Sequence, residues 1–313
     1  MRRFFVTLPL ALVLAAGLGA GSASAEVLAC EGGYSQQTIY QDQGTLEAVI
    51  AGNSGRLFVS SRPTGEEGSA LLRYGSPGND PTTVAESEPG AGGLAWDGHR
   101  MLWGNGNNLA NGSVGDETPM ARLLRVNLGN GNYSVVSDHL GMANGVVRAD
   151  NGAIYASNDF GSKLDRISSR GVTKNGWATL ESANGMAISR GGKYIFANQT
   201  LVTPSTISRI EIANPTNVKT WVSAEGLVDS NVVLDGLTRD NHGSLYAAAW
   251  ATGEIWKIDS DRRICVLASG IERPSSLDFG RGKKRFRSAR LFAVGFGGEI
   301  VQIMGARQAT YPG

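Results

Sequence analysis

A short phrase of sequence recurs six times along this chain of 313 residues. Each copy opens on a polar or small residue, continues into an apolar strand and a turn, and reaches a second apolar strand. The opening residues of the six copies are Glu47, Gly92, Asn144, Asn184, Asp235 and Ser275. Because the same strand pair returns at intervals, the chain is expected to build an array of similar small sheets.

A second echo follows each copy, in which a long polar residue lies between mostly apolar neighbours. These polar residues are separated by 52, 41, 43, 48 and 45 positions, and they are Arg73, Arg125, Arg166, Arg209, Lys257 and Gln302. A period of this length, with several short strands and turn signals in each unit, is typical of a β-propeller. No long helical periodicity competes with it. The predicted fold is therefore all-β, a six-bladed propeller.

The first 25 residues have the features of a secretory signal peptide. Arg2 and Arg3 precede an apolar run that ends near Ala20, and the small residues 23–25 suit cleavage. Cleavage would leave a single propeller domain, residues 26–313, whose 288 residues correspond to 48 for each of six blades. We expect its first strand, near residues 36–41, to enter the last blade as the outer strand and to close the ring.

This signal predicts a secreted, extracellular protein. Two other interpretations of the N-terminus stay open, because residues 27–30 loosely resemble a lipobox with an anchor at Cys30, and residues 2–5 faintly resemble a twin-arginine signal. No later stretch has the roughly 18 apolar residues that a transmembrane helix needs. We therefore expect no transmembrane segment.

The charge balance argues against two classes of partner. The formal net charge of +1 falls to −1 when Arg2 and Arg3 are removed, which favours neither nucleic acid nor an anionic membrane. One local exception is the stretch 281–290, which carries six Arg and Lys residues. It is either a polyanion contact or a solvated hairpin loop.

The chain has two cysteines, Cys30 and Cys265. In an exported protein such a pair can be bridged. The expected closing strand would bring Cys30 beside the outer strand of the fifth blade, where Cys265 lies. A structural disulfide and two unconnected thiols, one of them buried, are the two alternatives.

Alternating strand directions sort the connections of a propeller onto two faces. The residues that open the first strands share one face with the second-to-third connections, which include the insertion 104–119, Trp250 and Phe296. His99 and His242 fall in turns on the other face. His139, on the connection that leads to Asn144, is then the histidine that could carry a proton at the site, unless it is a plain loop residue. The insertion is either a lid or a connecting loop.

Four opening residues, Glu47, Asn144, Asn184 and Asp235, carry carboxylate or amide oxygens. If they converge on the ring axis, the two carboxylates would repel each other strongly without a cation. Oxygen donors suit calcium, with magnesium or manganese as alternatives, and the chain offers no Cys/His cluster for zinc. The other interpretation is that Asn-Gly and Asp-Gly are ordinary turn dipeptides and that the polar residues line a wet channel.

These positions resemble the senescence marker protein, gluconolactonase and luciferin-regenerating-enzyme superfamily of six-bladed propellers. Glu47 in the first blade, Asn144 in the third, Asn184-Gly185 in the fourth and Asp235-Gly236 in the fifth match the residues that hold one divalent cation in that family. The resemblance implies hydrolysis of a lactone or related ester. It implies that Asp235 is both a ligand and the general base, with Glu47 mainly a ligand.

The chain also departs from the sugar lactonases of this family. Met142 stands where they often carry Arg, and Gly145 follows Asn144 where they often carry Asp. Met142, Trp250 and Phe296 favour a less polar ester or lactone. Two functions of different classes therefore remain: a secreted metal-dependent hydrolase, and a non-catalytic extracellular propeller in which the ring holds a structural cation.

Overall fold

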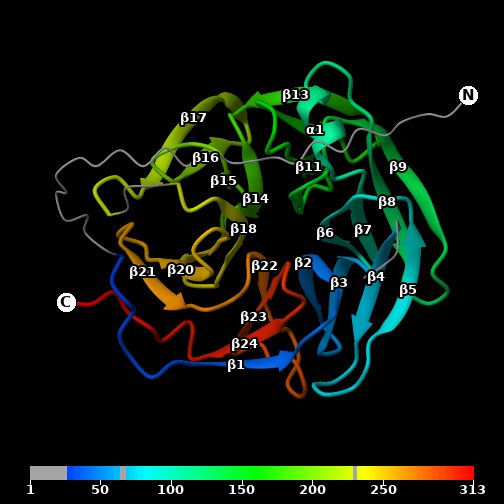
Figure 1. The fold of residues 1–313 in the computed structure, drawn as a ribbon. Coiled ribbons are helices and arrows are strands. Elements are labelled where there is room, and N and C mark those ends of the chain that lie inside the picture. The colour runs from blue at the N-terminus through cyan, green and yellow to red at the C-terminus, as the bar shows by residue number, and fades with distance from the viewer. Residues whose placement is uncertain (1–26, 64–67, 228–230) are drawn as a thin grey trace, which may run out of the picture.

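The computed structural model describes residues 27–63, 68–227 and 231–313. The predicted signal peptide lies outside these ranges. The described chain forms six four-stranded antiparallel sheets arranged as blades around a common axis (Figure 1). This confirms the predicted six-bladed propeller.

The first three blades follow chain order from the innermost strand outwards. Blade 1 contains β2 (Thr45–Gly52), β3 (Arg56–Arg62), β4 (Ser69–Tyr74) and β5 (Thr82–Ser87). Blade 2 contains β6 (Ala91–Asp97), β7 (Arg100–Asn105), β8 (Ala121–Asn127) and β9 (Tyr133–Leu140). Blade 3 contains β10 (Val146–Arg148), β11 (Ile154–Ala156), β12 (Lys163–Ile167) and β13 (Thr173–Thr179).

The last three blades continue the same pattern, and the sixth takes its outer strand from the N-terminal end. Blade 4 contains β14 (Ala183–Ile188), β15 (Tyr194–Gln199), β16 (Thr206–Glu211) and β17 (Asn214–Ser223). Blade 5 contains β18 (Leu234–Arg239), β19 (Leu245–Ala249), β20 (Glu254–Ile258) and β21 (Ile264–Ala268). Blade 6 contains β22 (Pro274–Phe279), β23 (Arg290–Gly295), β24 (Ile300–Met304) and β1 (Ser35–Tyr40).

The ring closes through β1, as predicted. β1 pairs antiparallel with β24, with Gln36 opposite Ile303 and Gln37 opposite Gln302. The two ends of the described chain thus meet in one sheet, and strands far apart in sequence lie side by side (Figure 1). Because the ring is closed in this way, every blade packs against two neighbouring blades.

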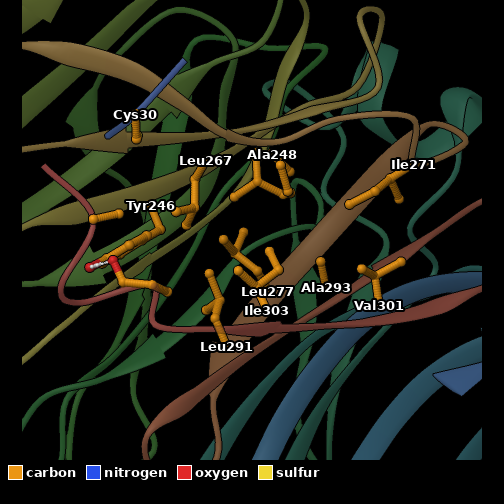
Figure 2. Close-up of a cluster of buried hydrophobic side chains, with 14 of the residues drawn as sticks. Cys30, Tyr246, Ala248, Leu267, Ile271, Leu277, Leu291, Ala293, Val301 and Ile303 are labelled. Atoms are coloured by element: carbon orange, nitrogen blue, oxygen red, sulfur yellow. Dashed lines mark hydrogen bonds between the residues drawn. The ribbon is translucent and has the colours of Figure 1, made fainter. Parts of the chain in front are cut away.

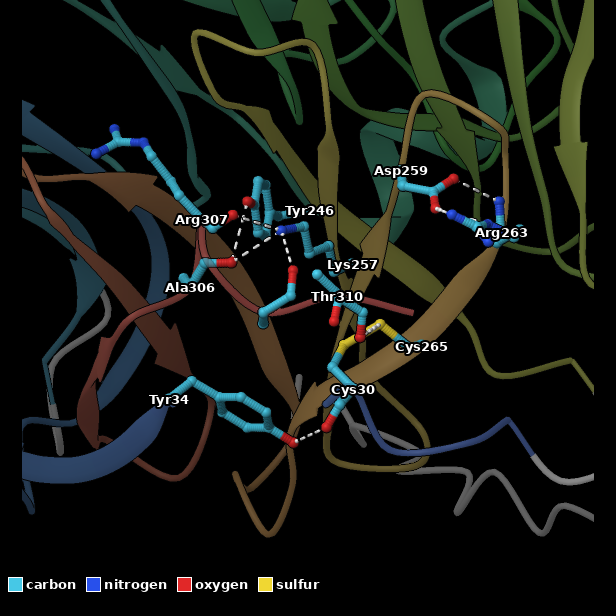
Figure 3. Close-up of a disulfide and its surroundings, with 11 residues drawn as sticks. Cys30, Tyr34, Tyr246, Lys257, Asp259, Arg263, Cys265, Ala306, Arg307 and Thr310 are labelled. Carbon is cyan, nitrogen blue, oxygen red and sulfur yellow. Dashed lines mark hydrogen bonds and ion pairs between the residues drawn. A yellow bond between two sulfur atoms is a disulfide. The ribbon is translucent and has the colours of Figure 1, made fainter. Parts of the chain in front are cut away.

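A disulfide fastens this closure to the neighbouring blade. Cys30 and Cys265 are bonded, with their Cα atoms 4.9 Å apart, which settles the two alternatives in favour of the bridge (Figure 3). Around it, Cys30 N–H donates to Val266 O and Val266 N–H donates to Leu28 O, each at 2.8 Å. The segment before β1 is therefore held against β21 by backbone hydrogen bonds as well as by sulfur.

Lys257 holds the C-terminal segment against the same blade. This buried side chain donates hydrogen bonds from Nζ to the carbonyl oxygens of Ala306, Arg307 and Ala309, at 3.1, 2.9 and 2.6 Å (Figure 3). Burial lowers the pKa of Lys257. The three acceptors satisfy the buried ammonium, so both chain ends are attached to blade 5.

The core consists of apolar clusters between neighbouring blades rather than one central core. Figure 2 shows the cluster between blades 5 and 6, where Ala248 and Leu267 face Leu277, Ala293 and Ile303. All five side chains are buried. Burial of this kind contributes roughly 25 cal/mol for each Å² of apolar surface removed from water, and it fixes each blade against the next.

The insertion 104–119 contains the one helix among the described residues, the short α1 (Leu109–Val114). Asn108 caps it by accepting a hydrogen bond from the backbone N–H of Asn111 at 2.9 Å. Across the described ranges, no helix is long and apolar enough to cross a membrane.

The basic stretch of blade 6 forms an exposed turn between β22 and β23. Phe286 at its centre is fully buried and packs edge-on against Phe292, with ring centroids 5.2 Å apart. Lys283, Lys284 and Arg285 are exposed around it. This turn lies at the end of β22 opposite to Ser275, the residue that opens the copy.

Candidate functional site

The structure brings the four predicted donor residues together at the ring axis. Glu47 lies in β2, Asn144 lies two residues before β10, Asn184 lies in β14 and Asp235 lies in β18. All four line one pocket along the axis, together with Ser275 of blade 6. Residues 188 positions apart in sequence thus share one cavity because each opens the innermost strand of its blade.

Glycine follows the opening residue in four blades, and the structure gives a reason other than a turn. A Cβ at any of these glycines would lie 2.3–2.5 Å from the carbonyl oxygen of the residue that opens the next blade. The four pairs are Gly93 with Asn144, Gly145 with Asn184, Gly185 with Asp235, and Gly236 with Ser275. Glycine therefore permits the close approach of neighbouring inner strands, and the turn interpretation of these dipeptides is wrong.

Glu47 is buried, with an exposed fraction of 6%. Its Oε1 accepts a hydrogen bond from Asn107 Nδ2 at 2.9 Å, and its Oε2 lies 3.7 Å from Arg62 Nη2. Desolvation raises the pKa of Glu47 to about 7; the Asp159 carboxylate adds to the rise, while Arg62 and the Asn107 hydrogen bond oppose it. Near pH 7 the Glu47 carboxyl is therefore divided between its charged and uncharged forms.

Asp235 is also buried, and neighbouring carboxylates act on its side chain as well. Desolvation raises its pKa well above the usual value, and repulsion from Glu47 and Asp159 raises it further. A hydrogen bond from Asn184 opposes the shift. The backbone around it is fixed, because Asn198 Nδ2 donates to the carbonyl oxygens of Asp235 and Gly236 at 2.7 and 3.0 Å.

A third carboxylate, Asp159, belongs to the site and was not among the predicted residues. It lies between β11 and β12, is 6% exposed, and has a pKa raised by desolvation and held down by a hydrogen bond from Asn144. Asn107 thus donates to Glu47, while Asn144 and Asn184 hold down the pKa values of Asp159 and Asp235.

Three buried side-chain oxygens near the donors lack a hydrogen-bond partner, although none belongs to the four predicted ligands. Asn107 Oδ1, Asp159 Oδ1 and Asn198 Oδ1 are buried and have no hydrogen-bond partner. Buried oxygens without a donor are costly unless a cation or water meets them. Within the described ranges no three His, Cys, Asp or Glu side chains cluster at metal-ligand spacing. A cation here would therefore need amide oxygens beside its carboxylates, and such a mixed set suits calcium.

His139 does not reach this site, so the sequence-based assignment of a proton carrier is corrected. The outermost strand β9 extends to Leu140, so His139 lies on the outer edge of blade 2 rather than on the connection that leads to the axis. Its side chain is 71% exposed and pairs with Asp138. His139 is absent from the residues that line the axial pocket.

The insertion 104–119 is anchored at the site rather than detached from it. Asn107 joins it to Glu47, and Asn158 Nδ2 donates to Gly112 O at 2.9 Å. Gly112 of α1 also lies against Met142, which is buried, so this position contributes no exposed surface. The insertion thus packs over the openings of blades 1 and 3.

The axial pocket continues from the donors along the inner strands to the opposite end. There it is lined by Trp96, Arg148, Asp278 and Arg281. Asp278 accepts a hydrogen bond from the backbone N–H of Ala51 at 2.9 Å, which ties blade 6 to blade 1. The far end of the pocket is therefore more basic than the end that carries the three carboxylates.

Comparisons with known proteins agree with this architecture. Residues 150–286 match the family model described as the SMP-30/Gluconolactonase/LRE-like region. No curated protein matches the chain.

Three solved structures illustrate the likeness of fold. A gluconolactonase from Xanthomonas campestris has a TM-score of 0.68 at 16% identity, covering 91% of this chain and 93% of its own. A luciferin-regenerating enzyme has a TM-score of 0.64 at 13% identity, covering 87% and 96%. A virginiamycin B lyase from Staphylococcus aureus has a TM-score of 0.58 at 10% identity, covering 87% and 99%. The chain thus carries an SMP-30/gluconolactonase/LRE-like region within a six-bladed propeller, as the resemblance in its sequence predicted.

Proposed function

We propose that this protein is a hydrolase of a lactone or related ester, with one divalent cation held at the axis by Glu47, Asn144, Asn184 and Asp235. The observation that carries the proposal is the convergence of these four residues on one pocket. The resemblance of their sequence positions to the cation ligands of the gluconolactonase family supports it. Calcium is the preferred cation, with magnesium and manganese as alternatives. Export by the N-terminal signal is part of the proposal.

Glu47 and Asp235 would supply the negative charge that a divalent cation balances. Asn144 and Asn184 would add amide oxygens without adding charge, and the hydrogen bond from Asn184 Nδ2 to Thr200 Oγ1, at 2.9 Å, holds the Asn184 amide in place. A bound cation would polarise the ester carbonyl and stabilise the negative charge that develops on its oxygen.

Asp235 would act as the general base. Its carboxylate takes a proton from the attacking water as the new C–O bond forms, and the proton then passes to the leaving alkoxide as the ester C–O bond breaks. Asn198 positions the Asp235 backbone for this role.

The proposal is tested by comparing wild type with Asp235→Asn on a panel of γ- and δ-lactones and aryl esters, with and without chelator, beside elemental analysis. We expect wild type to contain one divalent cation per chain and to lose turnover with the chelator. Asp235→Asn should lose turnover by at least about a hundredfold. Asp138→Asn, at an exposed carboxylate, is the matched control.

Two results would contradict the proposal. Unchanged turnover and unchanged metal content in Asp235→Asn would remove Asp235 from both roles. Retained metal with no turnover of any ester by wild type would instead support the non-catalytic propeller.

A further inference from the structure

Large side chains lie at or shortly after the end of the second strand in five blades, at the end of each blade that carries the donors, and we call this set the rim. Arg62 is the last residue of β3, and the other four follow their strands by one to four residues. The set consists of Phe160, Leu201, Trp250 and Phe296 in blades 3 to 6 and Arg62 in blade 1. Phe160 is 40% exposed and Leu201 is 55% exposed. The rim is thus apolar in four blades and cationic in one.

Arg62 connects this rim to the donor residues. Its guanidinium lies 5.6 Å from the ring centroid of Phe296, and its Nη2 lies 3.7 Å from Glu47 Oε2. Phe296 in turn meets Trp250 edge-on, with centroids 6.1 Å apart. A guanidinium that stacks on a ring keeps its N–H edge available for a carboxylate. The stack therefore places a cation beside Glu47, which lines the axial pocket, and two aromatic rings in line behind that cation.

A second arginine, Arg273, lies at the other end of the stack and pairs with a different carboxylate. Arg273 lies 5.9 Å from the ring centroid of Trp250, and its Nη2 is 2.8 Å from Glu272 Oε1. Its charge is thus balanced locally by Glu272. Arg62 is the arginine of the stack that contacts the donor set, through Glu47.

The charges around Glu47 determine whether an anionic ligand can bind near it, and Arg62 is a cationic group in contact with Glu47. A divalent cation would balance Glu47 and Asp235, which leaves the Asp159 carboxylate to repel negative groups. Met142 supplies no charge on the third blade. Among the described residues, Arg62 is the cationic side chain that contacts Glu47, so its charge would offset that of Asp159.

We propose that the substrate is an ester or lactone that combines an anionic group, bound by Arg62, with an apolar body, packed on Phe296 and Trp250. This inference rests on the proposed function and names the substrate class for the same site. Arg62 would act on binding and orientation, and Asp235 would remain the base.

The test uses two esters that differ in one group. The monoester 4-nitrophenyl glutarate ends in a carboxylate, whereas 4-nitrophenyl pentanoate has a methyl group at that place. Arg62→Gln should lower kcat/KM for the glutarate about tenfold or more beyond its effect on the pentanoate, since a charge-assisted hydrogen bond is lost only with the glutarate; the pentanoate reports the effect of Arg62 on Glu47 alone. Arg62→Lys, which keeps the charge but not the planar fork, should recover part of the loss.

Arg209→Gln is the matched control, because the Arg209 guanidinium also stacks on aromatic rings, 4.8 Å from the centroid of Tyr194, but on β16 and away from the pocket. It should leave both esters unchanged. Equal effects of Arg62→Gln on both esters would overturn the proposal, because they would show that Arg62 acts only through Glu47. Absence of any effect would overturn it equally.

A binding measurement separates this inference from the proposed function. Calorimetry on the calcium-loaded protein compares 4-phenylbutyrate with 4-phenylbutanol, which share the apolar body. Tighter binding of the butyrate by wild type, lost in Arg62→Gln, supports the anion site even if neither ester is hydrolysed and the hydrolase proposal fails. Equal affinity for the two compounds would contradict the anion site even if both esters are turned over.

Discussion

Asn107 donates a hydrogen bond of 2.9 Å to Oε1 of Glu47, although the two residues are 60 positions apart and lie in different blades. Asn107 also donates to Ala91 O at 2.9 Å, so its amide is fixed from both sides. Its Oδ1 is left buried without a partner. The insertion 104–119 is thereby part of the site, because it hydrogen-bonds one proposed ligand and lowers the pKa of that ligand.

Replacement of Asn107 by Ala should weaken calcium binding at pH 7 by roughly fivefold to tenfold, the equivalent of about one hydrogen bond. The loss of the donor raises the pKa of Glu47 further above about 7, so protons compete better with calcium. At pH 8.5 the effect should shrink, because Glu47 is then ionised in both proteins. Calcium titrations at the two pH values check this, with Asn175→Ala, at a hydrogen bond on the exposed rim, as the control. A pH-independent loss would contradict the argument.

Asp159→Asn should leave one cation bound per chain but lower its affinity by up to about tenfold, because a nearby negative charge is removed without removing a ligand. The pKa values of Glu47 and Asp235 should both fall, since Asp159 raises each of them. Stoichiometry from elemental analysis and affinity from titration are the measurements. Complete loss of the cation would show that Asp159 is itself a ligand.

The stability of the metal-free protein should fall as the pH rises. Glu47 has a folded pKa of about 7 against an ordinary value of 4.5, so its contribution to stability is present below pH 4.5 and is lost as the pH rises through 7. This loss is on the order of 3 kcal/mol for Glu47 alone. Asp235 and Asp159 shift in the same direction.

Calcium should reverse this trend, because it binds the ionised carboxylates. Melting temperatures measured from pH 4.5 to 8, with chelator and with calcium, check both arms. We expect the difference between them to be small at pH 4.5 and to grow above pH 6. A calcium effect that is the same at every pH would rule out carboxylates of raised pKa as the ligands.

Gly185→Ala should destabilise the protein by about 3 kcal/mol or prevent folding, because the added Cβ would lie 2.3 Å from Asp235 O and 2.4 Å from Leu237 N. Gly191→Ala is the matched control in the same blade, since no atom lies within 4 Å of a Cβ there. Urea unfolding of both variants gives the comparison. Equal stability of the two would show that the inner strands need no close approach.

The fold could be predicted from sequence because its signals are local and repeated. The period of the polar residues, from Arg73 to Gln302, marked the third strand of every blade, and the closing strand followed from counting strands in the last repeat. The opening residues Glu47, Asn144, Asn184 and Asp235 could be aligned for the same reason. The structure places all four on one pocket, as their equivalent positions required.

The residues that were missed belong to no repeated position. Asp159 and Asn107 lie on connections whose lengths differ between blades, so no alignment of repeats could show that they approach Glu47 and Asp235. Asn158 and Asp159 follow the second strand of blade 3, on the face that carries the donors, and this place in the repeat was the available signal. His139 was misplaced because the end of β9 carries no turn signal, and the strand runs one residue past it.

The central claim is that one divalent cation lies at the axis among Glu47, Asn144, Asn184 and Asp235. The most direct measurement is anomalous diffraction from crystals of the full chain grown with manganese. We predict a single strong peak within ligand distance of the Glu47 and Asp235 carboxylates. A peak elsewhere in the pocket, or none between these two side chains at millimolar manganese, would contradict it.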